Sequence, residues 1–133
     1  MKKYIQSIVF LALFGFSFII HAQEDQRVSH VVVVWLNEPG NAQMREKFIN
    51  TSRGLEDLPG VVSRHVSAVI PSERSINDDT FDVAVTVTFE NAQALKKYMK
   101  SQQHKDMLNK QLKPLVNRVV VYNFGNLWEA VRE

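Results

Sequence analysis

The sequence predicts an α+β fold, a βαββαβ chain whose strands form one antiparallel sheet with the helices on one face. Two observations predict it. Short runs rich in β-branched residues alternate with segments in which apolar residues recur near the 3.6-residue helical period. These segments follow one another in the order strand, helix, strand, strand, helix pair, strand. Two split βαβ units in this order form a ferredoxin-like sheet.

The first strand is predicted over Val28–Leu36, a short valine-rich run that stops before Asn37-Glu38-Pro39-Gly40. Because side chains alternate along a strand, His30 shares a face with Val32, and Val33 lies on the other face. Both faces are apolar apart from His30. We therefore expect this strand to be covered on both sides.

The first helix is predicted to begin at a cap formed by Asn41 and to end before Leu58-Pro59-Gly60. Its apolar stripe consists of Met44, Phe48, Ile49, Ser52 and Leu55. The second strand is predicted over Val61–Ile70, and residues 71–79 form a polar loop. His65 alternates with two serines in this strand, so we expect it to face solvent.

The third strand is predicted over Phe81–Phe89, where apolar and polar residues alternate most strictly. Asn91 is expected to cap the second helix, which carries Leu95, Tyr98 and Met99 on one side, and the helix is expected to break near Ser101. A second helical stripe then begins at Gln102 and contains His104, Met107, Leu108, Gln111 and Leu112. Pro114 ends it, and Leu115–Phe124 is the last strand.

The first 22 residues have the pattern of a signal peptide. Two lysines precede an apolar run over 8–20, and Ala22 is a small residue before a polar stretch. The run is short for a membrane span, which needs about 20 apolar residues. We expect cleavage after Ala22, export to the periplasm or the medium, and no membrane contact afterwards. An uncleaved amino-terminal anchor is the alternative.

Composition excludes several classes of protein. The chain has 16 basic and 14 acidic residues, but Lys2 and Lys3 leave with the signal, so the mature chain is formally neutral. A neutral chain predicts no nucleic-acid partner. Because there is no cysteine, neither a disulfide nor a thiol nucleophile is available. The length after cleavage fits one domain with one core.

Several short motifs occur in a specific order and spacing: His30-Val-Val-Val33, Leu58-Pro-Gly-Val61, Phe81–Glu90, Leu95-Lys-Lys-Tyr98, Gln103-His104-Lys105, Leu112-Lys-Pro-Leu115 and Val119–Phe124. In this order they resemble the stress-responsive dimeric α/β-barrel (Dabb) domain over residues 27–124, which leaves 125–133 as a carboxyl-terminal tail. The resemblance implies a ferredoxin-like protomer that pairs into a dimeric α/β barrel. A homodimer would also cover the second apolar face of the sheet.

The resemblance implies a site as well. By motif, His30, Tyr98 and His104 fall on the histidines and the tyrosine that line a pocket between sheet and helices in cyclase-type members. One imidazole would remove a proton next to a carbonyl, while the tyrosine and the other histidine stabilise the oxygen on which charge develops. Those members carry a further tyrosine on the first helix, where this chain has Thr51 and Ser52.

Two classes of function follow. The first is an exported stress-associated protein that binds a small apolar or phenolic molecule. The second is a cofactor-free enzyme, similar to polyketide cyclases or antibiotic-biosynthesis monooxygenases. Structural roles are the alternative: His104 would bond a backbone carbonyl, and His30 would anchor its strand to the loop before Pro114. No metal or cofactor is expected, because no acidic residue is spaced to complete a metal site with the two histidines.

Overall fold

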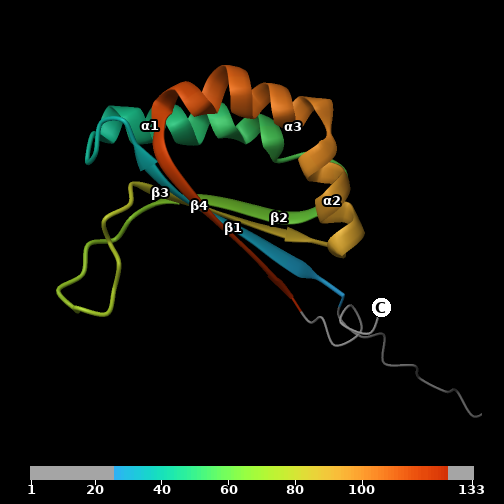
Figure 1. Cartoon of the computed structure of the whole chain (residues 1–133), viewed down its shortest axis with the longest axis horizontal. Helices are drawn as coiled ribbons and strands as arrows, with labels where there is room; N and C mark the ends of the chain where they lie inside the picture. The colour runs from blue at the N-terminus through green and yellow to red at the C-terminus, as the bar shows by residue number, and fades with distance from the viewer. Residues whose placement is uncertain (1–25, 126–133) are drawn as a thin grey trace, which may run out of the picture.

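A computed structural model of the chain describes residues 26–125. The predicted signal peptide and most of the tail lie outside the described residues. Four strands form one antiparallel sheet in the order β2-β3-β1-β4, and all the helices cover one face of it (Figure 1). This is the predicted arrangement. The elements are β1 Val28–Leu36, α1 Ala42–Ser52, η1 Arg53–Leu55, β2 Val61–Ala68, β3 Val83–Phe89, α2 Ala92–Lys100, α3 Gln102–Asp106, η2 Met107–Leu112, η3 Lys113–Leu115 and β4 Val116–Gly125.

The core lies between the sheet and the helices. The inner strands β1 and β3 place alternate residues on this side, and their side chains are almost wholly buried at Val34, Leu36, Val83, Val87 and Phe89. Phe48, Leu95 and Leu112 cover them from the helices. The strict alternation of β3 therefore reflects one buried face and one face turned away from the helices.

Asparagine caps fix where the two longer helices begin, as predicted. The side-chain oxygen of Asn41 accepts hydrogen bonds from the backbone N–H groups of Gln43 and Met44. Asn91 does the same for Ala94 at the start of α2. Each cap satisfies donors that the first helical turn leaves unpaired.

Gly60, in the predicted turn into β2, has a conformation that suits only glycine. Its φ of 86° is in the left-handed region, and a Cβ there would lie 2.7 Å from the Cβ of Ala94. The close approach holds the start of β2 against α2. It thereby fixes where α2 lies over the sheet.

Strand boundaries differ from the predicted ones by one or two residues. β2 ends at Ala68, because its partner β3 begins at Val83, and Ile70 is 85% exposed. β3 begins after Asp82, whose carboxylate turns toward the end of β1. The last strand starts one residue later than predicted, because Leu115 closes η3, and it continues to Gly125 opposite Val28.

The predicted helix from Gln102 is not regular. Its second half, η2, is a π-helix, in which each turn takes more residues than in an α-helix. The wider turn changes which residues of the predicted stripe face the core: Leu112 is buried as predicted, whereas Leu108 and Gln111 are exposed. Met99 of α2 was also expected to pack inward, but it is 42% exposed.

Within residues 26–125, no helix combines the length and the apolar character that crossing a membrane requires.

Candidate functional site

A row of polar residues crosses the otherwise apolar face that the helices cover. Arg64 of β2 pairs with Val87 of β3, and Val87 pairs with His30 of β1. His30 in turn pairs with Asn123 of β4. Because paired residues of neighbouring strands point to the same side, Arg64, His30 and Asn123 line up beneath the helices.

The helices add Tyr98 and His104 to this row. Ser101 takes an extended conformation between α2 and α3, at φ −62° and ψ 144°, and its hydroxyl accepts a hydrogen bond from the backbone N–H of His104. This is the predicted break. The Tyr98 ring centroid lies 4.6 Å from that of His104 and 6.4 Å from that of His30. The three predicted site residues are therefore gathered in one place.

All three are buried: His30 is 5%, Tyr98 4% and His104 8% exposed. Phe89 adds a ring 4.9 Å from Tyr98. Polar side chains this deep normally have hydrogen-bond partners. A buried polar atom of this group that lacks a partner would therefore indicate where a ligand bonds.

The partner of His30 differs from the structural alternative drawn from the sequence. His30 Nδ1 lies 2.6 Å from Oδ1 of Asn123 on the neighbouring strand, which makes Nδ1 the donor. The loop before β4 is held instead by Asn37, whose side-chain amide donates to the carbonyl of Pro114. The proposed link from His30 to that loop is therefore wrong. The Asn123 bond fixes the imidazole orientation and leaves Nε2 as the acceptor.

His104 has the least satisfied ring. Its Nδ1 is buried and finds no hydrogen-bond partner among residues 26–125. Burial lowers the pKa of His104, a hydrogen bond to the backbone carbonyl of Met99 opposes this, and the electrostatic interaction with His30 lowers the pKa further. The bond to Met99 is the one that the structural alternative for His104 expected. Since the pKa falls below its ordinary value, the ring is neutral at neutral pH. A neutral imidazole can accept a proton or donate one hydrogen bond.

Tyr98 is kept in its neutral form by its surroundings. Burial raises the pKa of Tyr98, and the charge and hydrogen bonding of the Arg64 guanidinium oppose this rise. A protonated phenol next to a guanidinium can donate a hydrogen bond to an oxygen atom. The site can therefore donate a hydrogen bond from the Tyr98 hydroxyl to a ligand oxygen, next to the neutral imidazole of His104, which can act as a base.

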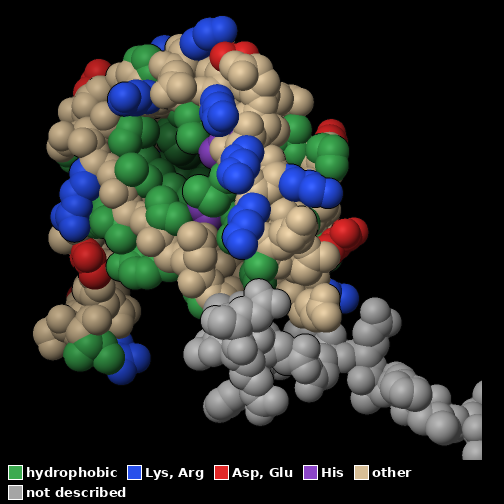
Figure 2. All heavy atoms as spheres, turned by 45° about the vertical axis from the view of Figure 1, so that its right-hand side comes forward, with side chains coloured by type: hydrophobic (Ala, Val, Ile, Leu, Met, Phe, Trp, Pro, Cys, Tyr) green, Lys and Arg blue, Asp and Glu red, His purple; other side chains and the backbone are tan. Residues whose placement is uncertain are grey.

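An apolar cleft opens beside these groups. It has a volume of about 250 Å³. Val32, which lies two residues from His30 on the same face of β1, forms its floor with Val34. Its other walls come from Phe48, Leu108, Asn109, Leu112, Lys113, Val116 and Val119. Figure 2 shows this face as an apolar hollow with histidine surface inside it and lysine or arginine side chains along one rim.

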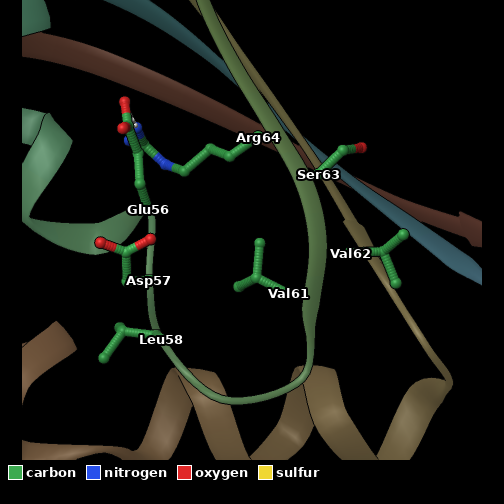
Figure 3. Close-up of a pocket in the computed structure, with 7 residues that line it drawn as sticks. All are labelled: Glu56, Asp57, Leu58, Val61, Val62, Ser63 and Arg64. Atoms are coloured by element: carbon green, nitrogen blue, oxygen red, sulfur yellow. Dashed lines mark ion pairs between the residues drawn. The ribbon is translucent and has the colours of Figure 1, made fainter.

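A second cavity, of about 470 Å³, lies inside the bend that leads into β2 (Figure 3). Residues 56–58 form one side of the bend and residues 61–64 the other. Arg64 reaches across toward Glu56, and Nη1 and Oε1 are 3.9 Å apart. This cavity touches the polar row only at Arg64.

Sequence reasoning missed Arg64 and Asn123. The sequence pattern could have indicated Arg64. Because side chains alternate along a strand, Arg64 lies on the face opposite the exposed His65 and on the same face as Val66. A charged residue on the inward face of a strand needs an explanation. No such pattern indicated Asn123, because its position depends on the pairing of β4 with β1.

No three His, Cys, Asp or Glu side chains in the described part of the chain are grouped closely enough to hold a metal ion.

Comparison with known proteins identifies relatives of the fold. A family model for the stress responsive A/B barrel domain matches residues 28–126. No curated protein shows significant similarity to the chain.

Three solved structures illustrate the likeness. A Dabb family protein with a ferredoxin-like fold from Mesorhizobium loti superposes with a TM-score of 0.62 at 15% identity, covering 75% of this chain and 96% of its own. A dimeric ferredoxin-like protein from Thermobifida fusca gives 0.60 at 15% identity, covering 77% and 93%. A hydroxynitrile lyase from Passiflora edulis gives 0.64 at 17% identity, covering 75% and 93%. At these identities the likeness establishes the fold alone.

Proposed function

Because the chain belongs to the stress-responsive A/B barrel (Dabb) domain family, we propose that it binds a small apolar or phenolic molecule between its sheet and its helices. The observation that carries the proposal is the buried Nδ1 of His104, which lacks a partner beside the Tyr98 phenol. A buried polar atom without a partner costs about 1–3 kcal/mol. An oxygen-bearing ligand that bonds this atom and occupies the neighbouring cleft would remove that cost.

His104→Ala is expected to abolish ligand binding while the protein stays folded, because removing the imidazole breaks few hydrogen bonds within the protein. Native mass spectrometry of the purified protein measures any ligand retained, and titration with 4-butylphenol measures binding directly. The melting temperature is recorded on the same sample. His65→Ala, which changes an exposed histidine of β2, is the matched control and should leave both quantities unchanged.

A different result would contradict the proposal. If His104 only supports the core, its loss should destabilise the fold by about 1–3 kcal/mol and leave phenol binding intact. Unchanged stability together with unchanged binding would exclude both roles for the ring.

A homodimer is part of the proposal. The face of the sheet turned away from the helices carries Val31 and Val33 of β1, and Tyr122 and Phe124 of β4 lie beside them. These two aromatic side chains are 55% and 57% exposed. Solved neighbours, including the Thermobifida fusca protein, are dimeric. A second copy packed on this face would cover it and close a barrel.

Export is proposed from the amino-terminal pattern of residues 1–22. Expression of the full chain in a bacterial host should yield periplasmic or secreted protein whose first residue is Gln23, as read by amino-terminal sequencing. Intact chains beginning at Met1 in the membrane fraction would instead support an uncleaved anchor. Intact chains found only in the cytosol would exclude export.

Catalysis without a cofactor is the second candidate, and the neutral state of His104 favours it. The lowered pKa of His104 lets its ring act as a base at neutral pH, while the Tyr98 hydroxyl donates to the oxygen on which charge develops. One solved neighbour is a hydroxynitrile lyase. In the first-helix region where the cyclases carry a tyrosine, this chain has Thr51 and Ser52, and Ser52 is buried and donates to the carbonyl of Ile49. That hydroxyl is committed to its own helix, which favours binding over cyclase chemistry.

A further inference from the structure

Arg64 is a buried cation with an incomplete set of partners. Its side chain is only 3% exposed, yet Nε and Nη1 find no hydrogen-bond partner within residues 26–125. The Glu56 carboxylate faces Nη1 at 3.9 Å, which is longer than a hydrogen bond, and its side chain is 47% exposed (Figure 3). A buried charge with so weak a counterion destabilises a fold. Stability therefore does not account for an arginine here.

The guanidinium acts on the candidate site through Tyr98. Arg64 stands in the same cross-strand row as His30, with only Val87 between them. Its charge and hydrogen bonding reach the Tyr98 phenol, which in turn stacks near His104. A ligand oxygen that meets the Tyr98 hydroxyl would therefore also meet a positive charge.

The helix surface over the site is positively charged, like Arg64. Between residues 91 and 113 the helices present six exposed lysines against a single acidic residue, Asp106. Figure 2 shows basic side chains in a line beside the apolar hollow. A basic rim around an apolar opening raises the local concentration of anions. The lysines are Lys96, Lys97, Lys100, Lys105, Lys110 and Lys113.

We propose that the ligand is an apolar acid whose carboxylate is bound by Arg64 beside the Tyr98 hydroxyl. The proposal rests on the proposed binding function and adds the charge of the ligand to it. A guanidinium presents parallel N–H groups that match the two oxygens of a carboxylate, and such charge-assisted bonds are roughly twice as strong as neutral ones. Arg64 itself does not line the cleft formed by Val32 and Phe48, so the apolar part of the acid would extend from Arg64 past Tyr98 and His30 toward it.

The test uses two probes of the same shape and different charge, 4-butylbenzoate and 4-butylbenzamide, titrated into the intact mature protein by calorimetry. The wild-type protein is expected to bind the benzoate about tenfold or more tightly than the benzamide. Arg64→Met keeps the length of the side chain and removes its charge. It should remove this preference by weakening benzoate binding alone.

Glu56→Gln is the matched control, because it removes the carboxylate that lies 3.9 Å from the guanidinium. Benzoate binding should stay equal or become tighter, since Glu56 no longer competes for Arg64. The melting temperature of Arg64→Met should not fall, because a methionine in a buried site needs no counterion.

Three results would overturn the proposal, and they are distinguishable. A benzoate preference that survives Arg64→Met, or no preference in the wild-type protein, refutes the role of Arg64 but leaves apolar binding standing. Loss of stability in both Arg64→Met and Glu56→Gln, with the preference unchanged, shows that the two residues form a structural pair. If the folded wild-type protein binds neither probe, the proposed function fails together with this inference.

Discussion

Val33→Asp is expected to separate the proposed homodimer into folded protomers. Val33 lies on the inner strand β1, on the face turned away from the helices, between Ala84 of β3 and Val120 of β4. In a single protomer it is only partly buried, so an aspartate there can still reach water. In the dimer a twofold axis would bury two such carboxylates without counterions, which costs several kcal/mol. Sedimentation equilibrium should therefore show a dimer dissociation constant raised by about a hundredfold or more.

Gln43→Asp is the matched control, since it adds the same charge on the exposed surface of α1. It should leave the dimer intact. Circular dichroism should show a folded sheet in both variants, which separates dissociation from unfolding. A wild-type protein that sediments as a monomer at micromolar concentration would contradict the dimer itself, and a Val33→Asp protein that stays dimeric would place the interface on another face.

Asp82→Ala is expected to destabilise the fold by about 3–5 kcal/mol, the largest effect of any substitution considered. Asp82 is 2% exposed, and its carboxylate accepts a hydrogen bond of 2.9 Å from the Leu36 N–H and one of 2.7 Å from the Gly40 N–H. Arg45 Nε lies 3.6 Å from the same carboxylate. Alanine would leave two backbone donors and a cation unpaired where β1 turns into α1. Urea unfolding followed by circular dichroism measures the change.

Asp78→Ala makes the matched comparison. The Asp78 carboxylate also accepts a backbone hydrogen bond, from the Thr80 N–H at 3.0 Å. Because Asp78 is exposed, water can accept this hydrogen bond after the substitution. We expect a change within about 1 kcal/mol. Equal losses in the two variants would show that burial of Asp82 is not what makes its bonds important.

The site shows where sequence reasoning was sufficient. His30, Tyr98 and His104 were predicted from motifs, and the break at Ser101 that lets the last two meet was predicted from a local change of pattern. The break and the approach of Tyr98 to His104 depend on residues within a few positions along the chain, such as the capping hydroxyl of Ser101. Local geometry of this kind follows from local sequence.

Three features could be predicted from the sequence: the order of the elements, the caps at Asn41 and Asn91, and which residues alternate on β1 and β3. All of these follow from short-range periodicity and side-chain chemistry. The row of Arg64, His30 and Asn123 became visible only in the fold, because strand register joins residues as far apart as the 93 positions between His30 and Asn123. Tertiary packing also sets the π-helical turn of η2, in which Gln111 is exposed although the helical pattern placed it on the inward stripe. Packing between distant segments sets both, and no local pattern encodes that packing.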